Sequence, residues 1–65
     1  MSFSKRFREL REAKGQTQAG LDEFFGLGRG SWVRWENGFD EPEEELLEEI
    51  AAYFGVKVHE LRGEG

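Results

Sequence analysis

Residues 17–38, TQAGLDEFFGLGRGSWVRWENG, decide the fold, because they predict two short helices joined by a tight turn. Thr17 can cap a first helix over 18–25, since its hydroxyl accepts a free backbone N–H of the first turn. Gly26 follows that helix, and glycine adopts the positive φ of a helix end without steric cost. A second helix is expected over 29–37. The stretch therefore predicts a helix-turn-helix unit.

Four large apolar side chains of this stretch recur at helical spacing. Leu21 and Phe25 are four residues apart, and Trp32 and Trp35 are three apart, so each pair lies on one helical face. Two short helices cannot bury such faces alone, so other helices must cover them. We expect Trp35 in the core, whereas the bulk of Trp32 suits the core and an exposed contact equally.

Three further helices are expected on either side of the central stretch. They span 3–14, 43–54 (with Pro42 at or just before the start) and 56–62. The pattern predicts an all-α fold, a compact bundle of five helices. We expect residues 1–65 to form one domain with a frayed tail at 62–65.

The composition lacks the residues of most catalytic and metal sites. The chain has no Cys and one His among 65 residues, which excludes disulfides and thiolate metal sites and disfavours zinc. No stretch approaches membrane-span length, and the N-terminus lacks the apolar run of a signal peptide. We therefore expect no enzyme, cofactor, metal ion, membrane contact or small-molecule substrate and, if the protein is natural, a cytoplasmic location.

The net charge of −5 is unevenly divided. Residues 1–36 carry seven Lys and Arg against five Asp and Glu, whereas residues 37–65 carry two against nine. Because phosphate binding depends on local basic charge, the N-terminal half could still face nucleic acid. The acidic half is expected to keep the protein soluble.

The chain resembles the Xre/Cro/C1-type helix-turn-helix family of DNA-binding domains. The resemblance covers residues 5–61 and is carried by these residues: Leu10-Arg11, Thr17-Gln18, Leu21, Gly26, Arg34-Trp35-Glu36-Asn37-Gly38, Pro42, and Ile50, Phe54-Gly55-Val56 and Leu61.

The resemblance implies that the third helix lies in the major groove of DNA, and that an Arg11–Glu36 ion pair links the first and third helices. By the same resemblance, Gln18 would hold a phosphate. The positions that would read bases are Arg29, Gly30, Val33 and Arg34.

The chain departs from the family pattern mainly on the second and third helices and the loop after them. Gly20 and Gly30 would each cost about 1 kcal/mol inside a helix. Gly30 and Val33 have no hydrogen-bond donor for base edges, and Val33 could at most touch a thymine methyl. Asp22 is expected to add negative charge beside the surface that would face DNA.

These departures favour a protein-binding module over a DNA reader. In this hypothesis an engineered helix-turn-helix scaffold presents an aromatic and apolar patch in place of DNA readout. The partner is an unidentified protein, an antibody constant region being one candidate. The patch comprises Phe24, Leu27, Gly30, Trp32, Val33, Arg29, Arg34, Gly20 and Phe39.

The alternative is a sequence-specific DNA-binding transcriptional regulator, acting as a homodimer on a palindrome. Its DNA contacts would be Gln18, Arg29, Gly30, Val33 and Arg34. A third hypothesis is an antitoxin or structural fragment that pairs through the patch with a partner chain.

Overall fold

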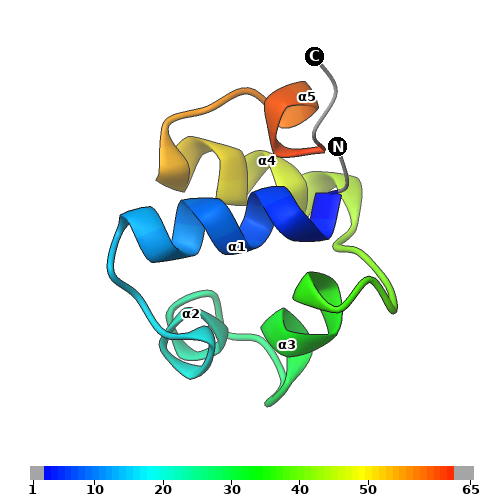
Figure 1. Cartoon of the computed structure of the whole chain (residues 1–65). Helices are drawn as coiled ribbons and strands as arrows, with labels where there is room; N and C mark the ends of the chain where they lie inside the picture. Colours follow the sequence, from blue (N-terminus) through cyan, green and yellow to red (C-terminus); the bar gives the residue numbers. More distant parts are fainter. Residues whose placement is uncertain (1–2, 63–65) are drawn as a thin grey trace.

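The structure, a computed structural model, describes residues 3–62. Within these residues five helices follow one another (Figure 1): α1, Phe3–Ala13; α2, Gln18–Phe24; α3, Ser31–Glu36; α4, Glu44–Phe54; and α5, Val58–Leu61. No residue in this range lies in a strand, so the predicted all-α class with five helices is confirmed.

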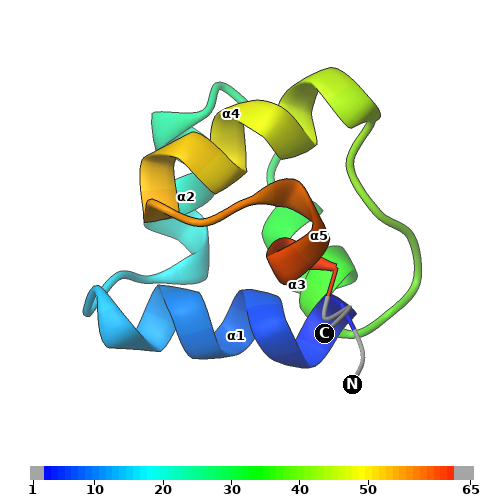
Figure 2. The same cartoon turned by 90° about the horizontal axis from the view of Figure 1, so that it is seen from above.

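The helices divide into two groups on either side of α1. Figure 1 shows α2 and α3 together at one end of the molecule, away from α5. Helix α1 contacts both α3 and α5, and α4 contacts α5. Seen from above in Figure 2, α5 lies between α1 and α4. The α2–α3 pair therefore projects from a support made by the other three helices.

Aromatic rings form the centre of the core. Phe7 and Trp32 stack with ring centroids 4.9 Å apart, and Trp35 meets Phe7 edge-on at 6.0 Å. Such ring pairs add stability beyond the area that they bury. The buried apolar residues are Phe7, Leu21, Trp32, Trp35, Leu47, Ile50, Ala51 and Leu61.

Trp32 has no exposed surface, so its placement in a contact patch is wrong. The expected core position of Trp35, which is 6% exposed, is confirmed. The indole of Trp32 fills space between α1 and α2 by stacking on Phe7 and, at 6.0 Å, on Phe25. A ring of this size lies where three helices meet, which sequence spacing on one helix does not reveal.

The start of α3 differs from the prediction in a way that explains Gly30. The helix begins at Ser31, and Gly30 is its N-cap with φ of 87°. Since side chains other than glycine's rarely adopt this left-handed conformation, Gly30 suits the turn and does not interrupt a helix. The expected cost of Gly30 inside a helix is therefore wrong.

The other helix ends lie close to their predicted positions. Thr17 is the N-cap of α2 and its Oγ1 accepts the N–H of Gly20 at 2.9 Å, as predicted. Helix α5 is shorter than expected and begins two residues later. Of the predicted frayed tail, Arg62 is the C-cap of α5, and residues 63–65 lie outside the described residues.

Candidate nucleic-acid interface

One carboxylate holds the turn between α2 and α3. Asp22 Oδ2 accepts the N–H of Gly30 at 3.0 Å, and Oδ1 accepts the N–H of Trp32 at 2.8 Å. The backbone carbonyl of Asp22 also accepts the N–H of Leu27 at 2.7 Å. Because the first N–H groups of a helix have no partner within it, α3 needs a cap that Gly30, lacking a side chain, cannot supply. Asp22 supplies that cap from α2.

The expected role of Asp22 as a surface charge is therefore wrong. Its residue surface is 6% exposed, and both carboxylate oxygens point at backbone N–H groups. A buried carboxylate satisfied in this way fixes the angle between α2 and α3. The acidic side chain exposed on this part of α2 is Glu23.

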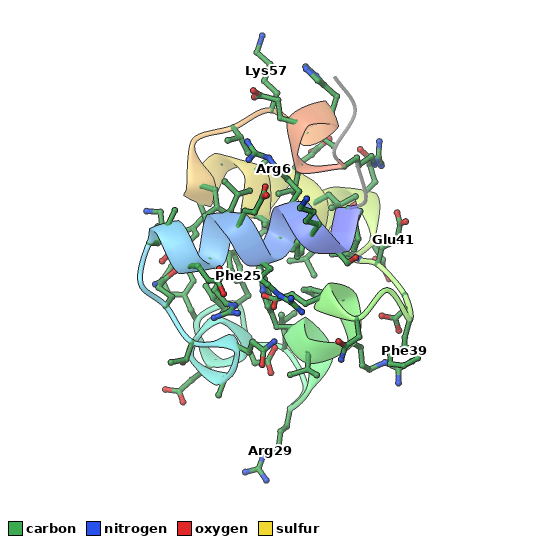
Figure 3. All side chains as sticks on the ribbon, viewed as in Figure 1. Arg6, Phe25, Arg29, Phe39, Glu41 and Lys57 are labelled. Atoms are coloured by element: carbon green, nitrogen blue, oxygen red, sulfur yellow. The ribbon has the colours of Figure 1, made fainter. Side chains whose placement is uncertain are left out.

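Helix α3 has one buried side and one outward side. Trp32, Trp35 and Glu36 are buried, whereas Val33 and Arg34 are exposed. Arg29, just before the helix, is also exposed, and Figure 3 shows its side chain extending away from the body of the molecule. The outward side of α3 thus carries Val33 and the guanidinium of Arg34, and a second guanidinium, that of Arg29, lies just before the helix.

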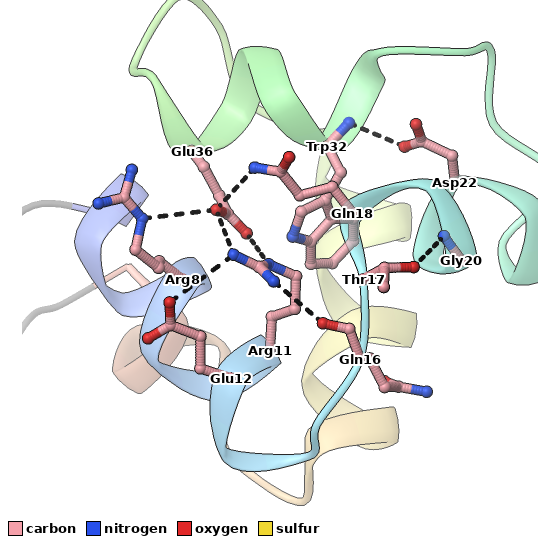
Figure 4. A network of polar contacts seen from close by, with 10 residues as sticks. All are labelled: Arg8, Arg11, Glu12, Gln16, Thr17, Gln18, Gly20, Asp22, Trp32 and Glu36. Atoms are coloured by element: carbon pink, nitrogen blue, oxygen red, sulfur yellow. Dashed lines mark hydrogen bonds and ion pairs between the residues drawn. The ribbon is translucent and has the colours of Figure 1, made fainter.

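A charged network joins α3 to α1 and α2 (Figure 4). Arg11 donates to Glu36 through Nε at 2.6 Å and Nη2 at 3.2 Å, which confirms the predicted ion pair. Gln18 Nε2 donates to Glu36 Oε1 at 3.0 Å, and Arg8 Nε lies 3.6 Å from the same oxygen. Arg11 Nη1 also donates to the carbonyl of Gln16 at 3.0 Å. The network links Glu36, the last residue of α3, to Gln18 in the first turn of α2 and to two arginines of α1.

Glu36 remains ionised in this network. Burial by itself would raise the pKa of its carboxyl. The hydrogen bonds from Arg11 and Gln18, with the positive charge of Arg11, outweigh burial and hold the pKa below its ordinary value. Glu36 is therefore a buried anion that accepts hydrogen bonds from Arg11 and Gln18 and forms an ion pair with Arg8.

The apolar members of the expected patch differ in exposure and come from different segments of the chain. Phe24 is 62% exposed and lies against Tyr53 of α4, with ring centroids 4.8 Å apart. Phe39, 72% exposed, lies in the loop after α3, and Val33 is 38% exposed on α3 itself. Leu27 is half-buried and packs against the core. These side chains come from α2, the turn after it, α3 and the loop after α3.

Gly20 has a local explanation in the first turn of α2. A Cβ at this position would lie 2.8 Å from Oγ1 of Thr17, the oxygen that caps the helix. A larger residue would therefore displace the cap. Gly20 fits the observed turn and need not be explained by the close approach of a partner.

Sequence reasoning missed one residue beside the outward side of α3. Asp40 Oδ2 lies 3.2 Å from both Nε and Nη2 of Arg34. The signal available was an acidic residue six positions after an arginine, across the turn at Gly38. Such a pattern is too common to single out a pair.

Residues 3–62 form neither a metal site nor a membrane-spanning helix. No group of three His, Asp or Glu side chains there could hold a metal ion. Among the helices of the described range, none has the length and apolar character needed to cross a bilayer.

Comparison with known proteins gives two matches. The helix-turn-helix domain family matches residues 2–63. The chain is also 30% identical over 59 residues to the cryptic phage CTXphi transcriptional repressor RstR of Vibrio cholerae. This alignment covers 91% of the chain but 53% of the relative, so the chain spans about half the length of that repressor.

The favoured hypothesis of an engineered protein-binding module is wrong. The family match runs through nearly the whole chain, and the relative is named as a transcriptional repressor. Neither match names a protein partner, an antibody constant region included. Three departures that suggested a new binding surface instead serve the fold: Asp22 caps α3, Gly30 forms the turn and Trp32 fills the core.

Proposed function

Since the chain belongs to the helix-turn-helix domain family, of the Xre/Cro/C1 type, we propose that it binds duplex DNA sequence-specifically as a transcriptional repressor. In this proposal α3 enters the major groove with its outward side toward the bases. The observation that carries it is the division of α3 into a buried aromatic side and an exposed side with Arg29, Val33 and Arg34. B-DNA's major groove admits one α-helix presented in this way.

The exposed side chains have the chemistry of base readout. A guanidinium can donate two parallel hydrogen bonds to O6 and N7 of guanine, and this suits Arg29 and Arg34. Val33 is exposed on α3 next to Arg34 in the sequence and can contact a thymine methyl. Direct readout by these three side chains therefore favours guanine and thymine.

Gln18 supports a phosphate contact beside α3. Its Nε2 carries two hydrogens, so donating one to Glu36 leaves the second for a phosphate oxygen. The hydrogen bond to Glu36 also fixes the carboxamide at the first turn of α2. Phosphate contacts of this kind set the register of a protein on the duplex without reading sequence.

The uneven charge of the chain is compatible with this role. The exposed acidic side chains of α4 include Glu44, Glu45, Glu48 and Glu49. Helix α4 is set back from the α2–α3 end of the molecule in Figure 1. Salt screens exposed charges over a Debye length of about 8 Å at physiological ionic strength, so carboxylates set back from the contact oppose DNA binding less than carboxylates in it.

The test is selection from a random duplex pool at low salt, followed by affinity measurements on the enriched sequence. We expect the logarithm of the association constant to fall linearly with the logarithm of the salt concentration. Arg29→Ala should weaken binding at least tenfold and reduce the salt slope by about 1. Lys57→Ala is the matched control, because Figure 3 shows Lys57 at the opposite end of the molecule from Arg29.

Two outcomes would contradict the proposal. A pool from which no sequence is enriched would exclude sequence-specific recognition by this chain. Equal losses from the Arg29 and Lys57 variants would mean that the two charges act only through the total charge, and that the outward side of α3 is not the contact surface.

A further inference from the structure

The loop after α3 folds back onto the helix and reaches Arg34. Gly38 has φ of 79°, and its N–H donates to the carbonyl of Trp35 at 3.2 Å. The N–H of Phe39 donates to the carbonyl of Arg34 at 3.0 Å. These two bonds form the Schellman pattern that ends many helices, in which the residue after the left-handed glycine approaches the last turn. Phe39 and Asp40 are thereby brought beside the Arg34 side chain.

The guanidinium of Arg34 is held by both of these residues. Asp40 Oδ2 lies 3.2 Å from Nε and 3.2 Å from Nη2, so one carboxylate oxygen occupies the edge of the guanidinium formed by Nε and Nη2. The centre of the guanidinium lies 6.0 Å from the centroid of the Phe39 ring, within the range of a cation–π contact. Arg34 is thus fixed by a carboxylate and by a ring that are adjacent in sequence.

Asp40 leaves free the edge of the guanidinium formed by Nη1 and Nη2, which is an edge that can donate two hydrogen bonds to guanine. A guanidinium has five N–H groups; the one on Nε donates to Asp40 Oδ2, and the same oxygen forms an ion pair with Nη2 on the side of one of its two hydrogens. The two hydrogens on Nη1 and the second on Nη2 remain. One from each nitrogen forms the parallel pair that fits O6 and N7 of guanine.

This arrangement contributes little to the fold itself. The side chains of Arg34 and Asp40 are 60% and 47% exposed, and exposed ion pairs add little to stability. Its physical effect is on Arg34 alone, whose long side chain loses rotational freedom before any ligand arrives. A side chain ordered in advance costs less entropy when it binds.

We propose that Asp40, assisted by Phe39, is a specificity-determining positioning residue that presents the outer edge of the Arg34 guanidinium to a guanine. The inference rests on the proposed DNA-binding function and adds a residue that does not itself contact a base. It requires that Asp40 improve discrimination although its negative charge lowers affinity for DNA of any sequence.

The experiment uses the whole chain and the enriched duplex described above. The guanine read by Arg34 is identified as the position whose base preference disappears in Arg34→Ala. Affinity is then measured for that duplex, for the same duplex with 7-deazaguanine at this position, and for an unrelated duplex. Replacement of N7 removes one of the two acceptors that Arg34 would use.

Asp40→Ala should strengthen binding to the unrelated duplex two- to threefold and reduce the preference for guanine over 7-deazaguanine at least fivefold. Asp40→Asn, whose carbonyl oxygen can still accept from Arg34, should recover part of the preference. Glu41→Ala is the matched control, since it removes the same charge from the same loop, in which Figure 3 shows Glu41 farther along toward α4. It should strengthen binding to the unrelated duplex equally and keep the full preference.

Each remaining outcome overturns the inference and has a distinct meaning. If Asp40→Ala and Glu41→Ala behave alike, Asp40 acts only as a charge. If no position depends on Arg34, the inference fails while the proposed function stands. If no duplex is enriched, both fail together. Thermal unfolding of the variants separates these results from a loss of fold, because Asp40→Ala should leave the midpoint within about 2 °C of the wild type.

Discussion

The carboxylate of Asp22 on α2 accepts the backbone N–H of Trp32 on α3 at 2.8 Å. The other oxygen accepts the N–H of Gly30, so one side chain both caps α3 and fastens it to α2. A helix of six residues has little stability of its own, because helix nucleation is unfavourable. Its orientation therefore depends on contacts such as this one.

Asp22→Ala should destabilise the protein by about 2 to 3 kcal/mol, because it leaves two N–H groups at the start of α3 without an acceptor. Asp22→Asn should cost less, since its carbonyl oxygen can still accept one of them. Urea unfolding at pH 7 measures both values. Glu23→Ala, adjacent and exposed, is the control and should stay within about 0.5 kcal/mol of the wild type. Equal effects of the Asp22 and Glu23 changes would contradict the capping role.

Arg11→Met should destabilise by about 3 kcal/mol, because it leaves the ionised Glu36 carboxylate buried without its main partner. Arg6→Met on the same helix removes the partly exposed pair of Arg6 with Glu9 and should cost less than about 0.5 kcal/mol, since pairs in contact with solvent add little. Urea unfolding near pH 7 compares the two variants. A loss in Arg11→Met no larger than in Arg6→Met would show that Arg8 and Gln18 suffice to hold Glu36.

The lowered pKa of Glu36 also predicts a dependence on pH. A carboxyl whose pKa is lower in the folded state than the ordinary value of 4.5 stabilises the fold fully above about pH 4.5. That contribution is lost as the pH falls through the lowered value. Glu36→Gln should therefore be less stable than the wild type at pH 7, with a difference that shrinks as the solution is acidified. If the stability difference between Glu36→Gln and the wild type stayed constant from pH 7 down to pH 2, the lowered pKa of Glu36 would be contradicted.

The features that the sequence predicted correctly are mostly local. Thr17 and the spacing of apolar residues define the helices, and the Arg11–Glu36 pair follows from the resemblance. Asp22 and Trp32 were misjudged because their roles depend on atoms from another helix. The two N–H donors that Asp22 accepts, on Gly30 and Trp32, lie eight and ten residues from it, beyond the reach of helical periodicity.

Gly30 was misjudged for a different reason. The expected helix began two residues too early, and a glycine placed inside a helix appears costly. In the structure Gly30 precedes α3 in a left-handed conformation, which glycine adopts at a lower free-energy cost than other residues. The error in one helix boundary thus created an apparent departure from the family pattern, which in turn supported the wrong function.

Gly30→Ala should destabilise by about 1 kcal/mol, the cost of a left-handed conformation for a residue with a Cβ. No atom lies within 4 Å of the added Cβ, so backbone conformation alone accounts for the loss. Gly28→Ala is the control, because its Cβ would lie 3.8 Å from Oγ of Ser31, an ordinary contact, at a position without a left-handed φ. The denaturant midpoints of the two variants measure their loss of stability. A Gly28 variant as unstable as the Gly30 variant would show that the whole turn resists added volume.

Val33 provides a test of base contact that does not involve charge. If its side chain meets a thymine methyl in the groove, replacing that thymine by deoxyuridine should weaken binding by the wild type about fourfold, the value of one buried methyl group. Val33→Ala should bind the thymine duplex more weakly and lose the distinction between thymine and deoxyuridine. The measurement is a cycle of four affinities, two proteins on two duplexes, with the base changed at each thymine of the enriched site in turn. Thymine dependence that persists in Val33→Ala at every position would assign the methyl contact to another residue, and would leave the two arginines as the base-reading groups on this side of α3.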